Sequence, residues 1–205
     1  MTPQAVAARL KRRGRTERHE GILQATIDEL QAVGYDRMTM DAVAERAGAS
    51  KATLYRHWPG KAELVVAAIR YMKGVDTATL PDTGSLRTDL LTLLSGAMNS
   101  SGHEQLCVMR GMISACGADP ELARAFQEQV IDAKRGGALQ ILARAQERGE
   151  VSEAADIQFL VDAAPAMLIF RHLLTPHDVD EVYLARLVDE VWLPLLTRAT
   201  PAPHH

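Results

Sequence analysis

The residue types best suited to chemistry gather in one short stretch that is rich in hydrogen-bond donors. Between positions 50 and 61 it holds two hydroxyls, two lysines, a phenol, an arginine and a histidine: Ser50, Lys51, Thr53, Tyr55, Arg56, His57 and Lys61. Such groups donate hydrogen bonds to phosphate oxygens and to the edges of nucleic-acid bases. The stretch therefore predicts recognition of a polyanion.

Two short helices and a tight turn must position these donors. Thr39 can cap a first helix that stops at Gly48. One face of that helix is apolar: Met40, Val43, Ala44 and Ala47. Ser50 can cap a second helix, residues 51–57, which Trp58-Pro59-Gly60 ends. Two short helices joined by Gly48-Ala49-Ser50 are typical of a helix-turn-helix.

The second helix has one apolar side and a polar side opposite to it. Leu54 is its only large aliphatic residue and is expected to face the core. The opposite direction is flanked by Ala52 and Arg56, with Thr53 nearby, and Lys51, Tyr55 and His57 form the margins. A small residue, a hydroxyl and an arginine suit insertion into a major groove, and the margins offer donors to the phosphates on either side.

The stretch from Thr39 to Leu64 resembles the DNA-binding signature of the tetracycline-repressor (TetR) family. The matching residues are Thr39, Val43, Ala44, Ala47, Gly48, Ala49, Ser50, Ala52, Leu54, Tyr55, His57, Lys61 and Leu64. Ala52 stands where the family commonly has glycine, and Trp58 where it has phenylalanine. The first departure means that base preference is not inherited with the resemblance.

The resemblance implies a role for each donor. Phosphate contacts are implied for Thr39, Lys51, Tyr55, His57 and Lys61. Base edges are implied for Ala52, Thr53 and Arg56, with Ser50 as the cap of the recognition helix. Two alternatives stay open: the ring of Tyr55 could pack into the core of the head, and Lys61 could be ordinary surface charge on the helix that follows.

Charge is distributed unevenly along the chain. Residues 1–73 hold 13 Lys and Arg against 8 Asp and Glu, whereas residues 74–205 hold 10 against 18. Six of the basic residues crowd into one arm: Arg9, Lys11, Arg12, Arg13, Arg15 and Arg18. This asymmetry favours an N-terminal part that meets a polyanion, although a solvated tail would explain the arm alone.

The remaining pattern is helical throughout, which predicts an all-α protein with a head at residues 1–73 and a body at residues 74–205. A linker is expected at 74–84. Helices are expected near residues 16–33, 61–73, 85–100, 104–116, 120–148, 154–174 and 178–197. The pair Gly136-Gly137 predicts a bend or a close helix crossing inside the long helix at 120–148.

The last two helices are expected to hold a homodimer together. Residues 148–151, 162–165, 170–174 and 179–188 resemble one subgroup of family bodies, in which these helices form a four-helix interface. The segment 163–169 carries no charge, and the last helix has one apolar stripe: Leu184, Leu187, Val188, Val191 and Leu195. The alternative is an intramolecular core.

A pocket for a small apolar or amphipathic effector is the further expectation for the body. Methionine-rich surfaces are deformable and suit such a cavity. The candidate residues are Met98, Met109, Met112, Cys116, Phe126, Met167 and Phe170. Each of them would also serve as core filler.

Other classes find little support in the sequence. It has no G-x-S-x-G, P-loop, G-x-G-x-x-G, H-E-x-x-H or C-x-x-C motif, so neither an enzyme nor a cofactor is predicted. The two cysteines and seven histidines form no metal-ligating cluster, and no apolar run spans a membrane. We expect a cytoplasmic, ligand-responsive repressor that binds a palindromic DNA operator. A DNA-binding protein without ligand control, or an architectural one, is the alternative.

Overall fold

The computed structural model describes residues 3–75, 79–98, 103–175 and 177–197, without the side chains of 3–15, 97–98, 103–107, 164, 172 and 173. All regular structure within these ranges is helical. The chain divides into two compact units, of which one comprises residues 1–76 and 107–130 and the other 77–106 and 131–205. The all-α prediction is confirmed.

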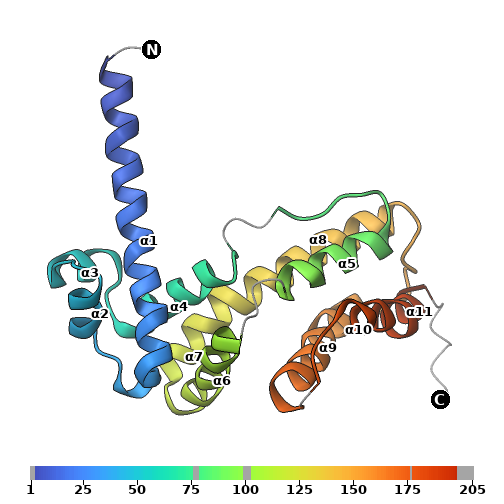
Figure 1. Cartoon of the computed structure of the whole chain (residues 1–205). Coiled ribbons are helices and arrows are strands. Elements are labelled where there is room, and N and C mark those ends of the chain that lie inside the picture. The colour runs from blue at the N-terminus through green and yellow to red at the C-terminus, as the bar shows by residue number, and fades with distance from the viewer. Residues whose placement is uncertain (1–2, 76–78, 99–102, 176, 198–205) are drawn as a thin grey trace. The chain divides into compact units, whose positions relative to one another are not determined.

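The first unit contains the predicted helix-turn-helix (Figure 1). Its helices are α1 (Pro3–Arg37), α2 (Met40–Arg46), α3 (Lys51–His57), α4 (Lys61–Met72), most of α6 (His103–Ala118) and α7 (Pro120–Phe126). The regular course of α1 is interrupted at Gly34, where φ is +77°, so the predicted stop at this residue is confirmed. Helix α4 packs against both α1 and α7.

One continuous hydrophobic core fills this unit. It joins Ile22 and Ile27 of α1, Val43 of α2 and Leu54 of α3 to the apolar face of α4. The same cluster continues into Met112 of α6 and into α7 and the turn after it, through Leu122, Ala125 and Val130. The three N-terminal helices therefore do not have a core of their own.

The second unit holds the remaining helices around a separate core. They are α5 (Leu86–Met98), α8 (Asp132–Glu147), α9 (Ile157–Ile169), α10 (Glu181–Arg186) and α11 (Leu193–Thr197). Helix α5 packs along α8 and against α10, and α8 packs against α9 (Figure 1). Single π-helical segments follow α7, α9 and α10, at Gln127–Ile131, Phe170–Leu174 and Leu187–Trp192.

The helix expected at 120–148 differs from the prediction in one respect. Its irregularity is the π-helical segment Gln127–Ile131, whereas the glycine pair lies inside the regular helix α8. Gly137 instead permits a close approach, since a Cβ there would come within 2.9 Å of the Leu80 side chain. The missing side chain thus lets the linker residue Leu80 pack closely against α8.

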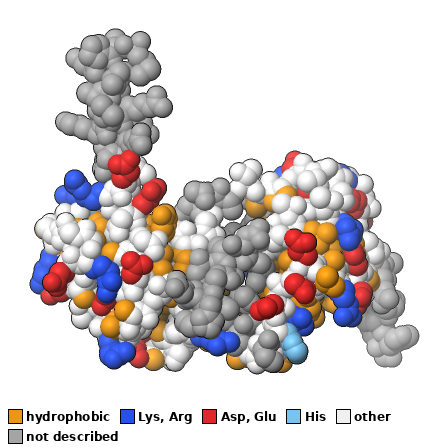
Figure 2. Space-filling model, in the orientation of Figure 1, with side chains coloured by type: hydrophobic (Ala, Val, Ile, Leu, Met, Phe, Trp, Pro, Cys, Tyr) orange, Lys and Arg blue, Asp and Glu red, His pale blue; other side chains and the backbone are white. Residues whose placement is uncertain are grey.

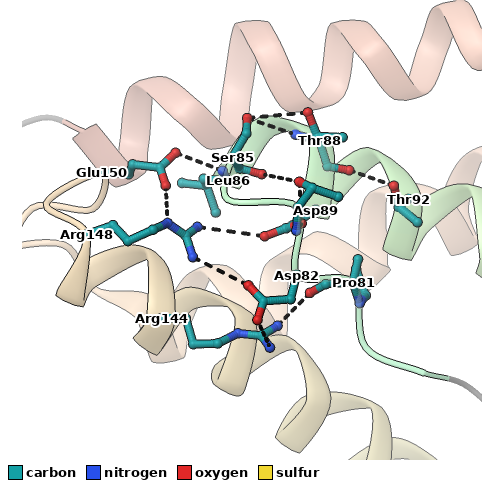
Figure 3. A network of polar contacts seen from close by, with 11 residues as sticks. Pro81, Asp82, Ser85, Leu86, Thr88, Asp89, Thr92, Arg144, Arg148 and Glu150 are labelled. Carbon is teal, nitrogen blue, oxygen red and sulfur yellow. Dashed lines mark hydrogen bonds and ion pairs between the residues drawn. The ribbon is translucent and has the colours of Figure 1, made fainter.

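A polar network fastens the end of the linker to the end of α8 (Figure 3). Asp89, fully buried in the first turn of α5, accepts hydrogen bonds from the backbone and hydroxyl of Thr83 at 2.8 and 2.7 Å and lies 3.7 Å from Arg148. Arg148 also pairs with Glu150 at 2.6 Å, and Glu150 accepts the N–H of Leu86. These bonds cap α5 and fix residues 83–86, because a buried carboxylate requires compensating partners.

The apolar stripe of the last helix lies mainly inside the second unit. Leu184, Leu187 and Val188 are buried in its core, and Val191 packs against that core. For Leu184, Leu187 and Val188 this burial supports the intramolecular alternative, and the dimer itself stays a prediction. The physical reason for this burial is that α5 and the end of α8 cover this face of the helix within the same chain.

Candidate nucleic-acid interface

Side-chain caps at both N-termini define the helix-turn-helix. The N–H of Ala42 donates to the Thr39 hydroxyl at 3.1 Å, and the N–H of Thr53 donates to the Ser50 hydroxyl at 3.2 Å. Both predicted caps are therefore confirmed. Each cap satisfies one of the backbone donors that a helix leaves unpaired at its start.

The turn between the two helices depends on Gly48. Its φ of +59° lies in the left-handed region, which side chains with a Cβ adopt only at a cost. The turn is closed by backbone bonds from Gly48 to Glu45 and from Ala49 to Ala44, at 3.1 and 2.9 Å. The recognition helix α3 then leaves the turn with Leu54 as its one buried residue, at 0% exposure.

The face of α3 opposite Leu54 is available to a partner. Ala52 and Arg56 are exposed, and Thr53 is half-buried. The Thr53 hydroxyl lies 2.9 Å from that of Ser50, so these two residues share one hydrogen bond at the start of the helix. Arg56 is thus the long donor of this face, and its role in reading base edges stays a prediction.

The margins of α3 also point outward. Tyr55 is 51% exposed, so its ring is not packed into the core as the alternative required. Lys51 is exposed and forms an ion pair with Asp41 of α2 at 2.6 Å. This exposed pair is worth little and can yield to a phosphate. Figure 2 shows basic side chains around α2 and α3 with acidic ones among them.

Lys61 contacts the end of α1 through both a hydrogen bond and an aromatic ring. Its ammonium group donates to the carbonyl of Asp36 at 3.3 Å and lies 4.2 Å from the centre of the Tyr35 ring. Partial burial lowers the pKa of this lysine, against the opposing influence of Asp36 and Asp119. Its contact with DNA stays a prediction.

Two histidines and a tryptophan form an aromatic cluster beside α3 that the sequence reasoning missed. The ring of His19, on α1, stacks on Trp58 at 4.7 Å and meets the ring of His57 edge-on at 5.6 Å. Burial lowers the pKa of His19, and the neighbouring His57 lowers it further. No local signal reveals the cluster, because His19 and Trp58 are 39 positions apart and meet only in the folded head.

A small basic groove separates α1 from α3. It has a volume of about 40 Å³ and is lined by Arg18, His19, Ile22, Thr53, Arg56 and His57. The groove brings Arg18 of the basic arm beside three predicted DNA ligands of α3, namely Thr53, Arg56 and His57. The side chains of the other arm residues, Arg9 to Arg15, lie outside the described residues.

The predicted effector residues fall in both units. Met109, Cys116 and Phe126 are half-buried against the core of the first unit, and Met112 is fully buried within it. Met167 and Phe170 belong to the second unit and are exposed. Met98 lies outside the described side chains. Cys116 carries a free thiol, whose pKa is raised by burial and by the charge of Asp119.

The described residues offer neither a metal-binding cluster nor a membrane-spanning helix. No group of three His, Cys, Asp or Glu side chains within the described part of the chain could hold a metal ion. Among the described helices, none is long and apolar enough to cross a membrane.

Sequence comparisons identify the head and the body separately. Residues 22–68 match the model of bacterial regulatory proteins of the tetR family. Residues 80–191 match a tetracyclin repressor-like C-terminal domain. Together these two matches cover the helix-turn-helix and most of the described residues after the linker.

Similar proteins are found along nearly the whole chain. The HTH-type transcriptional regulator Rv1556 of Mycobacterium tuberculosis is 41% identical over 184 residues, which cover 89% of this chain and 90% of the relative. The DNA-binding transcriptional repressor TetR of Mycobacteroides abscessus is 35% identical over 184 residues, covering 90% and 96%. The crystal structure of the TetR family transcription regulator SCO0332 is 30% identical, with a TM-score of 0.69 over 87% of this chain and 97% of that one.

The relatives and the geometry agree on the class of protein. A capped, outward-facing recognition helix occupies the region that matches the regulatory-protein model. This is a non-enzymatic fold that binds DNA through its helix-turn-helix. The chain belongs to the TetR family of helix-turn-helix transcriptional regulators.

Proposed function

We propose that this regulator is a ligand-responsive repressor that binds a palindromic operator as a homodimer. The observation that carries the proposal is the recognition helix itself. It has one buried residue, Leu54, and it exposes Ala52, Tyr55, Arg56 and His57. A helix docked through one side chain, with donors along the rest of its surface, is suited to enter a major groove.

The donors divide into those that position and those that specify. Thr39, Lys51, Tyr55, His57 and Lys61 are proposed to hold phosphates, and Arg18 joins them from the groove beside α3. Ala52, Thr53 and Arg56 are proposed to meet base edges. An arginine can bind a guanine through two parallel hydrogen bonds and so distinguish it from other bases. Phosphate contacts carry no such sequence information.

An exposed apolar surface supports a second copy of the chain as partner. In α9 and the π-helical segment after it, Met167, Ile169 and Phe170 are exposed although residues 163–170 carry no charge. Four further large apolar side chains are also exposed, namely Phe159, Leu174, Val182 and Leu195. Exposed apolar residues in such number mark interaction surfaces. A two-fold dimer would also supply the pair of recognition helices, about 34–36 Å apart, that a palindrome requires.

Repression and an effector site complete the proposed function. The relative in M. abscessus is named a repressor, which supports repression as the function of this chain. Met109, Met112, Cys116 and Phe126 pack on the core that also holds α3. A small apolar or amphipathic molecule inserted among these adaptable side chains would disturb the seat of the recognition helix.

Binding to DNA fragments that flank the gene tests the proposal. We expect one fragment to bind at least about a thousandfold more tightly than random DNA of equal length. A stoichiometry of two chains per site is expected. Equal affinity for all fragments would instead support the architectural alternative.

Ligand response needs a separate measurement. Compounds that bind the protein in calorimetry should weaken its binding to that fragment by roughly 5- to 150-fold, and the fragment should weaken compound binding by the same factor. Compounds that bind equally well with and without DNA would contradict ligand control.

A further inference from the structure

Helix α7 is held at its first turn by the end of α1. Tyr35 follows the break in α1, and its hydroxyl donates to Asp119 Oδ2 at 2.6 Å. The other carboxylate oxygen, Oδ1, accepts the N–H groups of Glu121 and Leu122 at 3.0 and 3.1 Å. One carboxylate thus caps α7 and anchors it to the head. The ammonium of Lys61, the first residue of α4, lies over the same Tyr35 ring.

The turn that follows α7 is held by the other end of α4. Arg70, in the last turn of α4, donates to the carbonyl of Gln129 at 2.5 Å. Gln129 lies in the π-helical segment after α7, and such segments occur frequently at functional sites. Between these two contacts, Leu122 and Ala125 are buried in the core that they share with α4.

In the hydrogen bond between Tyr35 and Asp119, the phenol stays the donor and the carboxylate the acceptor throughout the neutral pH range. The hydrogen bond from Tyr35 is the main cause that lowers the pKa of Asp119, followed by the N–H of Leu122. Burial, followed by the hydrogen bond to Asp119, raises the pKa of Tyr35 well above its ordinary value. The phenol therefore remains a donor and the carboxylate an acceptor, as a charge-assisted hydrogen bond requires.

We propose that α7 is the element that couples the rest of the chain to the recognition helix, and that Tyr35 and Arg70 are the positioning residues of this coupling. The inference rests on the proposed function. One of the three passages of the chain between the two units lies between Val130 and Ile131, within the π-helical segment that follows α7. Any displacement of α7 must either break a contact to Tyr35 or Arg70 or carry both ends of α4 with it.

Hydrogen exchange of the full-length protein, with and without the selected operator fragment, tests this coupling. In the wild type, DNA should slow the exchange of amides 51–57, which it covers, and also that of amides 120–131. We expect the second effect to be at least about fivefold, the lower end of ordinary coupling between sites. In Tyr35→Phe combined with Arg70→Met, the slowing at 120–131 should fall below about twofold while that at 51–57 persists.

Matched substitutions outside these contacts provide the control. Tyr71→Phe alters an exposed phenol of α4, and Arg124→Met alters an exposed arginine of α7 that pairs with Glu128. Both should retain the wild-type slowing at 120–131. Asp119→Asn keeps an acceptor for Tyr35 and a cap for α7, so it should retain most of the effect as well.

Several results would overturn the inference. One is a wild type in which DNA slows the hydrogen exchange of amides 51–57 but not that of amides 120–131. This comparison needs no substitution. Another is equal slowing at 120–131 in the wild type and in the folded double variant. Absence of slowing at 51–57 would refute operator binding itself, and the coupling with it.

Discussion

Replacement of Leu54 by alanine isolates the docking of the recognition helix from its chemistry. The side chain is completely buried and is the only buried residue of α3. A helix of seven residues is not stable by itself in water, so α3 depends on this contact for its position. Truncation of a buried leucine to alanine costs about 2–5 kcal/mol, because a cavity is left in addition to the lost transfer free energy.

The expected consequences differ for stability and for DNA binding. A loss of about 3 kcal/mol lowers the melting temperature by roughly 6–12 °C for a chain of this size. Binding to the operator at 20 °C should weaken at least about tenfold, which corresponds to about 1.4 kcal/mol, because the helix must be ordered again in the complex. Calorimetric melting and fluorescence anisotropy with labelled operator measure the two effects.

Leu142→Ala is the matched control for this experiment. Leu142 is buried to a similar degree, but it lies in α8 and in the core of the second unit. Its truncation should lower the melting temperature comparably and leave the affinity for operator within about twofold. If Leu54→Ala melted and bound DNA as the wild type does, the single-residue docking of α3 would be refuted.

Three further perturbations address reading, assembly and pH. Arg56→Ala should change the preference among base pairs by roughly 1–3 kcal/mol per lost contact. Lys51→Ala should instead weaken binding to DNA of every sequence alike and flatten its salt dependence. An equal loss of affinity for every sequence with Arg56→Ala would contradict base reading. Phe170→Glu with Val182→Glu should convert a dimer into a monomer in sedimentation, and a wild type that is monomeric at micromolar concentration would contradict the dimer. Since the folded-state pKa of His19 lies below its ordinary value of 6.5, the unfolded chain binds the proton first, and stability should fall as the pH drops below about 6.5. His19→Phe keeps a ring on Trp58 and should reduce this dependence in urea titrations at pH 7.5 and 5.5; an unchanged dependence would contradict the assignment.

The sequence alone predicted the local features of the DNA-binding head, because short-range rules govern them. Thr39 and Ser50 were predicted as caps, residues 51–57 as the recognition helix, and Leu54 as its core contact. Capping, glycine in a left-handed turn and the helical repeat each depend on residues within one or two turns of the chain. The resemblance to the TetR family rested on the same stretch.

Contacts between distant segments could only come from the tertiary structure. The stack of His19 on Trp58, the bond from Tyr35 to Asp119 and the bond from Arg70 to Gln129 join residues 39, 84 and 59 positions apart. The apolar pattern of the sequence also could not distinguish a helix face covered by the same chain from an exposed one. The helical repeat places Leu187 and Leu195 on one stripe, yet Leu187 is buried within its own chain and Leu195 is exposed. An apolar repeat specifies that a face needs covering, and only the packing of α5 and α8 decides which part of it is already covered.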